Sequence, residues 1–123
     1  MKNIITTMAL ALTMGLSAQQ FDFTPATEAH KSKANEVSEY FDDALGLTSK
    51  QEALVSKNYT EFIAKKEFII SSDRSNEEKN TALKALYVEQ GRELNDIFTV
   101  YQRKKFKDIR SKYDPLLLVT SDN

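Results

Sequence analysis

The 123-residue chain contains no cysteine, three glycines and two prolines. Without cysteine, neither disulfide bonds nor thiol chemistry contributes to the protein. All three methionines lie within the first 14 residues and His30 is the single histidine, so side chains offer almost no ligands for a soft metal. The scarcity of turn residues and the lack of any long polar–apolar alternation argue against a β-sheet protein. The sequence therefore predicts an all-α fold.

The sequence also lacks an excess of charge of one sign. Its 17 Lys and Arg nearly balance its 18 Asp and Glu, for a net charge of −1. A dedicated nucleic-acid-binding protein is usually strongly basic, so we expect no nucleic-acid partner. No nucleophile elbow, phosphate-binding loop or metal-ligand spacing occurs in the sequence. We therefore expect neither an enzyme nor a bound cofactor.

Residues 1–18 have the pattern of a cleaved signal peptide. Lys2 provides the positive charge, Ile4 to Leu16 is apolar or small, and Ser17-Ala18 offers small residues for cleavage. This apolar run is shorter than the roughly 20 residues of a membrane-spanning helix, so a retained anchor and stable membrane insertion are the minor alternative. No cysteine follows it to carry a lipid anchor. The predicted location is the periplasm, with secretion as the alternative.

Four segments after the signal peptide are distinguishable by composition. Residues 19–27 form an extended or disordered lead-in, with Phe21 and Phe23 docking on the body. Residues 28–114 form a helical domain, and residues 115–123 form an apolar tail that packs on the protein or on a partner. Helices are expected over residues 28–45, 48–70 and 75–98, and from residue 99 to residue 114. Thr99 either begins the fourth helix or lies at a kink in a longer one.

Apolar residues recur at helical spacings of three and four. The stripes comprise Val37, Phe41 and Ala44; Val55, Tyr59, Phe62, Ile63, Ile69 and Ile70; Leu83, Leu86, Tyr87, Leu94, Ile97 and Phe98; and Phe106, Ile109 and Tyr113. Lys66 and Gln90 interrupt two of them, either to set helix pairing or as side chains at a stripe's edge. Gly46 suits a left-handed helix end, and Gly91 marks a close crossing or a bend.

A degenerate motif occurs twice, 51 residues apart. It reads Leu47-Thr48-x-x-Gln51 and Phe98-Thr99-x-x-Gln102. Each copy is a capping box, in which the Thr hydroxyl accepts from the N–H three residues on and the Gln side chain accepts from the Thr N–H. Ser75 to Glu78 is a third such box. Loss of one cap typically costs about 1 kcal/mol.

The paired motifs, their separation and the export signal resemble the Spy/CpxP family of periplasmic proteins with LTxxQ motifs. The first motif matches outright, and the second has Phe98 in place of Leu and continues into Gln102-Arg103-Lys104-Lys105-Phe106. The resemblance implies an elongated, bent hairpin of about four helices that pairs into a thin, cradle-like homodimer. It also implies ATP-independent chaperone activity toward unfolded or misfolded envelope proteins. The motif residues Leu47, Thr48, Gln51, Phe98, Thr99 and Gln102 are then structural.

Two other functions stay open within the resemblance. Some relatives bind the sensor domain of an envelope-stress kinase and damp its signalling. Metal-responsive relatives use His, Met or Cys, of which only His30 follows the signal peptide. His30 is either half of a metal site or pH sensor, or an exposed helix-end residue.

Two sets of residues are candidates for binding client proteins. Arg103, Lys107 and Arg110 share one helical face beside the last apolar stripe, forming either a client-attracting surface or a solvated face. Phe62, Phe68 and Ile69 are either exposed residues that grip an unfolded chain or ordinary core.

Overall fold

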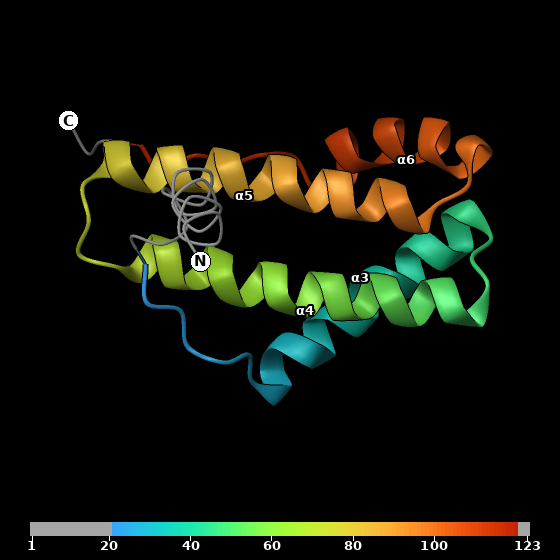
Figure 1. The fold of residues 1–123 in the computed structure, drawn as a ribbon, viewed down its shortest axis with the longest axis horizontal. Helices are drawn as coiled ribbons and strands as arrows, with labels where there is room; N and C mark the ends of the chain where they lie inside the picture. Colours follow the sequence, from blue (N-terminus) through green and yellow to red (C-terminus); the bar gives the residue numbers. More distant parts are fainter. Residues whose placement is uncertain (1–20, 121–123) are drawn as a thin grey trace, which may run out of the picture.

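The computed structural model describes residues 21–120 and is helical apart from its two ends and its turns. Its helices are α3 (Glu28–Leu45), α4 (Ser49–Ser71), α5 (Asn76–Ile97) and α6 (Val100–Tyr113) (Figure 1). The all-α prediction is confirmed, with the expected helix bounds met to within one or two residues. Residues 1–20 and 121–123 lie outside the described residues, and with them the predicted signal peptide and the ends of the lead-in and tail.

Each of these four helices begins with a capping box. The N-cap side chain accepts from the backbone N–H three residues on, and the side chain of that residue accepts from the backbone N–H of the N-cap. The N-caps are Thr27, Thr48, Ser75 and Thr99. Gly46 ends α3 with φ +68°, the left-handed conformation predicted for it. Thr99 starts a separate helix, because Phe98 before it is extended and ends α5. Of the two alternatives for residues 98–102, the turn is therefore correct.

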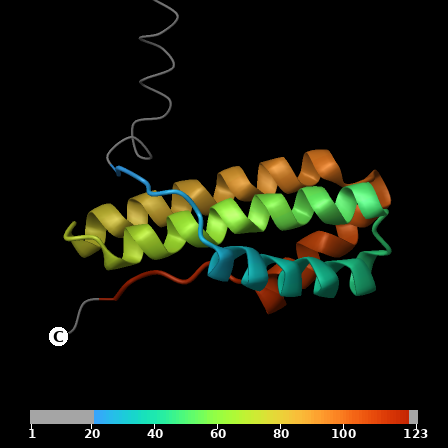
Figure 2. The same cartoon turned by 90° about the horizontal axis from the view of Figure 1, so that it is seen from below.

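The helices form two layers. The long helices α4 and α5 run side by side as a hairpin, and α3 and α6 lie against one face of that hairpin toward one end (Figures 1 and 2). The remaining part of that face is followed by the extended segment after α6 (Figure 2). This arrangement leaves the hairpin covered by helices at one end and by extended chain at the other.

The main core lies where α3, α4, α5 and α6 meet. It is largely aromatic and consists of Ala34, Val37, Phe41, Leu45, Val55, Tyr59, Phe62, Leu94, Phe98 and Phe106. The Phe41 ring lies 5.5 Å from that of Phe106 and 5.7 Å from that of Tyr59, which joins three helices through one side chain. Tyr40 of α3 stacks on Tyr113 of α6 with centroids 3.9 Å apart.

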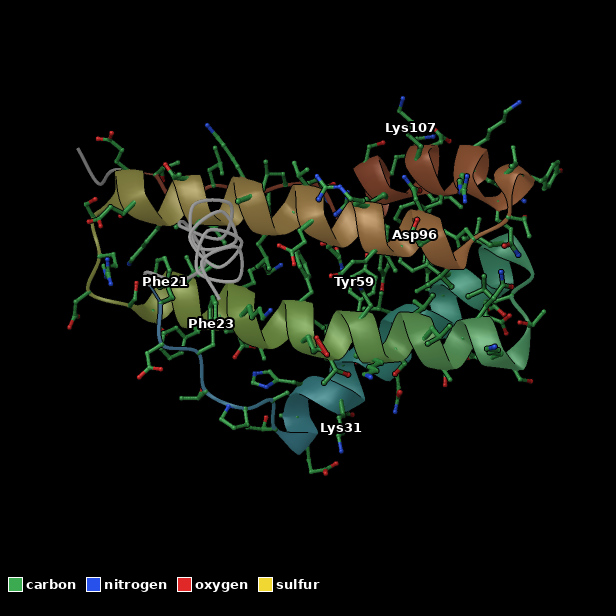
Figure 3. All side chains as sticks on the ribbon, in the orientation of Figure 1. Phe21, Phe23, Lys31, Tyr59, Asp96 and Lys107 are labelled. Carbon is green, nitrogen blue, oxygen red and sulfur yellow. The ribbon has the colours of Figure 1, made fainter. Side chains whose placement is uncertain are left out.

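A second, smaller core lies at the other end of the hairpin. It consists of Phe21, Ile69, Ala82 and Leu83, with Phe23, Phe68, Leu86 and Val119 packed around it. Figure 3 shows Phe21 and Phe23 against this end of α4. The predicted docking of these two aromatics on the body is thus observed, and the tail contributes Val119 to the same cluster.

The apolar stripes predicted the buried faces with few exceptions. Ile70 is 44% exposed, because it lies one residue beyond the buried Ile69 on the helix surface. Gln90, which interrupts a stripe, is buried all the same. Between residues 21 and 120, no helix is both long enough and apolar enough to cross a membrane.

Candidate functional site

The two threonine–glutamine motifs lie together in space. In each motif the glutamine side-chain oxygen accepts a hydrogen bond from the backbone N–H of the threonine. The donor–acceptor distance is 2.9 Å both in Thr48–Gln51 and in Thr99–Gln102. The two glutamine side chains also bond each other, since Gln51 Nε2 donates to Gln102 Oε1 at 2.8 Å and Gln102 Nε2 lies 3.3 Å from Gln51 Oε1. Two helix starts 51 positions apart are therefore joined by one amide pair.

Each glutamine also bonds the end of the helix that precedes the other motif. Gln51 Nε2 donates to the carbonyl oxygen of Ile97 at 3.0 Å, at the end of α5. Gln102 Nε2 lies 3.3 Å from the carbonyl oxygen of Gly46 and 3.4 Å from that of Leu45, at the end of α3. The motif pair thus satisfies both N–H and C=O groups at two helix junctions. This is a structural role and provides no chemistry of its own.

A basic groove separates α5 from α6. It has a volume of about 540 Å³ and is lined by Tyr87, Gly91, Asn95, Arg103, Lys104, Phe106, Lys107, Arg110 and Ser111. The predicted cationic face of Arg103, Lys107 and Arg110 therefore lines one groove. Lys104 completes it, a residue that helical spacing from Arg103 did not single out. We use the name basic groove for these nine residues.

Arg110 is the most enclosed cation of the basic groove. Its guanidinium carbon lies 3.5 Å from the centroid of the Tyr87 ring, a cation–π contact. Its Nη2 donates to the Tyr87 carbonyl oxygen at 2.6 Å and to Gln90 Oε1 at 2.7 Å. A Cβ added at Gly91 would lie 2.6 Å from Arg110 Nη1. Gly91 therefore marks the close approach of a side chain, neither of the two helix features expected for it.

The positive charge of the basic groove is not neutralised by neighbouring carboxylates. Between residues 21 and 120, the ion pairs of α6 are limited to Lys112 with Asp108, at 3.3 Å. Arg103 is tied to the backbone instead, its Nε donating to the carbonyl oxygen of Asn95 at 2.7 Å. Arg110 Nε and Gln90 Nε2 are buried without a hydrogen-bond partner among the described residues. The groove can therefore attract an anionic group.

A polar cluster lies at the end of α6. The Tyr59 hydroxyl donates to Asp114 Oδ2 at 3.1 Å, and the Tyr87 hydroxyl donates to the Asp114 carbonyl oxygen at 3.1 Å. Burial, and next the negative charge of Asp114, raise the pKa of Tyr59 well above its ordinary value. Tyr59 stays protonated and fixes the point at which the chain leaves α6.

The three apolar candidates for client binding do not form an exposed surface. Phe62 is 5% exposed and Ile69 is 1% exposed, so both are core residues and the interpretation of them as a client-gripping surface is wrong for this conformation. Phe68 is partly buried against the second core. The structure places Phe62 and Ile69 inside because both lie on the α4 stripe that faces the other helices.

Two other polar candidates have structural partners. His30 Nδ1 accepts from the Thr27 N–H at 2.9 Å in the first capping box, and its Nε2 lies 3.0 Å from Glu67 Oε1. His30 therefore lies at the start of α3, as the second alternative expected, but it is partly buried rather than exposed and links α3 to α4. The Lys66 ammonium lies 5.5 Å from the Phe62 ring centroid, at the edge of the stripe.

The comparisons with known proteins return no relative. No protein-family model, curated protein or solved structure matches the chain.

Proposed function

We propose that this protein is an exported, ATP-independent chaperone-like protein that binds unfolded or misfolded envelope proteins, as its resemblance to the Spy/CpxP family implies. The observation that carries the proposal is the basic groove. It combines four cations with the rings of Tyr87 and Phe106, in a surface that no described carboxylate neutralises. The motif pair supports it only indirectly, because it holds the ends of α3 and α5 together.

Such a surface suits partly unfolded, acidic polypeptides. Cations attract carboxylates over about one Debye length, roughly 8–10 Å at physiological salt, without demanding a fixed geometry. Lys104 and Lys107 are exposed and make no hydrogen bond or ion pair among the described residues, and the apolar parts of the groove add short-range contacts. A binding mode of this kind is tolerant of sequence, as a chaperone requires.

The test is suppression of aggregation without nucleotide. Light scattering by an unfolding acidic protein unrelated to this chain should fall in the presence of an equimolar amount of the protein. Because the attraction is electrostatic, the effect should weaken as salt is raised. Unchanged scattering at several-fold excess would refute the proposal.

A pair of double variants locates the activity. Lys104→Glu/Lys107→Glu reverses two exposed charges of the basic groove that make no hydrogen bond or ion pair among the described residues. Lys50→Glu/Lys57→Glu makes the same charge change on exposed positions of α4. We expect the first variant to require at least several-fold more protein for equal suppression, and the second to act like the wild type.

The same proteins distinguish a chaperone from a signalling accessory. In a pull-down from envelope extract, a chaperone should recover a broad set of unfolded envelope proteins, and the Lys104→Glu/Lys107→Glu variant should recover less of them. Recovery of one folded sensor-kinase domain in stoichiometric amount would replace the proposal with the accessory function.

A further inference from the structure

The described part of the apolar tail packs on the protein, the first of the two alternatives expected for it, and asparagine side chains of α5 hold its backbone. After Pro115 the chain is neither helix nor strand, and it runs along α5 away from α6 to the far end of the hairpin (Figures 1 and 2). Residues 114–120 are here called the strap. Its first residue, Asp114, is fixed by Tyr59 and Tyr87.

The far end of the strap is gripped through its backbone. Asn80 Oδ1 accepts from the Val119 N–H at 2.7 Å, while Asn80 Nδ2 donates to the Val119 carbonyl oxygen at 2.9 Å. One turn earlier on α5, Asn76 Nδ2 donates to the Thr120 carbonyl oxygen at 3.2 Å. On the strap, these bonds involve only main-chain N–H and C=O groups. They therefore do not depend on which side chains the extended segment carries.

An apolar floor lies beside the two asparagines. It is made by Phe21, Ile69, Ala82 and Leu83, and Val119 packs against it together with Phe23, Phe68 and Leu86. The strap's leucines fill it poorly, since Leu117 is 72% exposed, Leu118 39% and Leu116 37%. The strap therefore gains little side-chain burial for the chain entropy that it loses on docking. Its docking at this end depends mainly on the main-chain bonds to the asparagines, which another extended segment can also make.

We propose that Asn76, Asn80 and the apolar floor form an acceptor site for an extended apolar polypeptide segment, and that the strap is its resident occupant. Segments of an unfolded protein are the outside occupant, an identity that rests on the function proposed above. Main-chain bonds from the asparagines supply affinity for any extended backbone, and the floor selects apolar side chains. The strap then competes with such segments and shields the floor when none is bound.

The full chain reports on its own strap. In the ¹⁵N-labelled protein, hydrogen exchange at the Val119 amide measures the bond to Asn80. An excess of an unlabelled peptide of residues 114–123 should displace the strap and speed that exchange at least ten-fold, with saturation. A peptide carrying Ser at positions 116–119 should have a much smaller effect. Unchanged exchange at high concentrations of the first peptide would overturn the proposal.

Two variants provide an independent measurement. Asn80→Ala removes both bonds to Val119 and should speed its exchange at least ten-fold. Asn95→Ala is the matched control, because Asn95 is exposed on the same helix and its side chain makes no hydrogen bond among the described residues. Equal exchange in both variants would also overturn the acceptor site. Circular dichroism verifies that each variant remains folded.

An unfolded acidic protein, added in place of the peptide, separates this inference from the proposed function. Faster Val119 exchange with both ligands supports the two together. Displacement by the peptide but not by the unfolded protein supports the acceptor site and counts against the chaperone function. Suppression of aggregation without displacement by either ligand supports the chaperone function and overturns the acceptor site.

Discussion

At the scale of single residues, the side-chain amides of the two motif glutamines each bond two helix ends at once. The amide oxygen accepts from a backbone N–H at a helix start, and the amide nitrogen donates to a carbonyl at the end of another helix. Gln102 is 8% exposed, so its partners would be left without water if it were removed. An unsatisfied buried polar group typically costs about 1–3 kcal/mol.

We predict energetic coupling between Gln51 and Gln102. Each single change to Ala should lower the free energy of unfolding by about 1–3 kcal/mol. The double variant should lose less than the sum, by about 0.5–3 kcal/mol, because the two amides bond each other. Urea unfolding of the wild type, the two single variants and the double variant measures this difference.

Glu78 provides the matched comparison for that cycle. It caps α5 through Ser75, as Gln51 caps α4, but it forms no hydrogen bond with either glutamine among the described residues. Effects of Gln51→Ala and Glu78→Ala should therefore add. Strict additivity of Gln51→Ala with Gln102→Ala would show that the amide pair contributes nothing.

At the scale of helices, the packing of α6 on α5 depends on one small residue. Gly91 leaves room for the guanidinium of Arg110, which would otherwise meet a Cβ at 2.6 Å. Glycine in a helix interior costs up to about 1 kcal/mol relative to alanine. The glycine thus lowers local helix propensity, and the space that it leaves is occupied by a side chain from the neighbouring helix.

The effect of Gly91→Ala should accordingly depend on Arg110. In an Arg110→Ala background, we expect Gly91→Ala to stabilise the protein by up to about 1 kcal/mol through helix propensity. With Arg110 present, the gain should shrink or reverse, because the guanidinium must leave the Tyr87 carbonyl and Gln90. Thermal unfolding of the four proteins tests this, and an equal gain in both backgrounds would contradict the assigned contact.

At the scale of the whole molecule, the single chain leaves much apolar surface in contact with water. Tyr101 is 79% exposed and Val100 67%, immediately after the second motif threonine. Val88 of α5 and Leu54 of α4 are exposed as well. Where such side chains gather into one patch, that patch marks a surface for association with a partner or with a second copy.

The homodimer implied by the family resemblance remains a prediction. Sedimentation equilibrium of the chain from Gln19 onward should give twice the chain mass, falling toward one chain mass on dilution. Tyr101→Ser removes a ring that is largely exposed in the single chain. The change should move this equilibrium toward the monomer where the dimer buries that ring. A single chain mass across the whole concentration range would refute the dimer.

Much of the architecture was readable from local patterns. A capping box joins side chains and backbone N–H groups within the first turn of one helix, and an apolar stripe repeats within one helix. Both are therefore properties of residues that are close in the sequence. They predicted the four helices, the left-handed Gly46 and most of the core. They also brought Arg103, Lys107 and Arg110 to one face, which the basic groove confirms.

Other features depend on which distant segments come together, and local patterns do not contain that information. Three contacts are of this kind. Gln51 bonds Gln102, 51 residues away, and Arg110 packs against Gly91, 19 residues away. Asn80 bonds Val119, 39 residues away. Burial of Phe62 and Ile69 follows from the packing of α4 against its neighbours. Helix positions are set by short-range hydrogen bonds, whereas these contacts exist only once the hairpin has closed and α6 and the strap have folded back onto it.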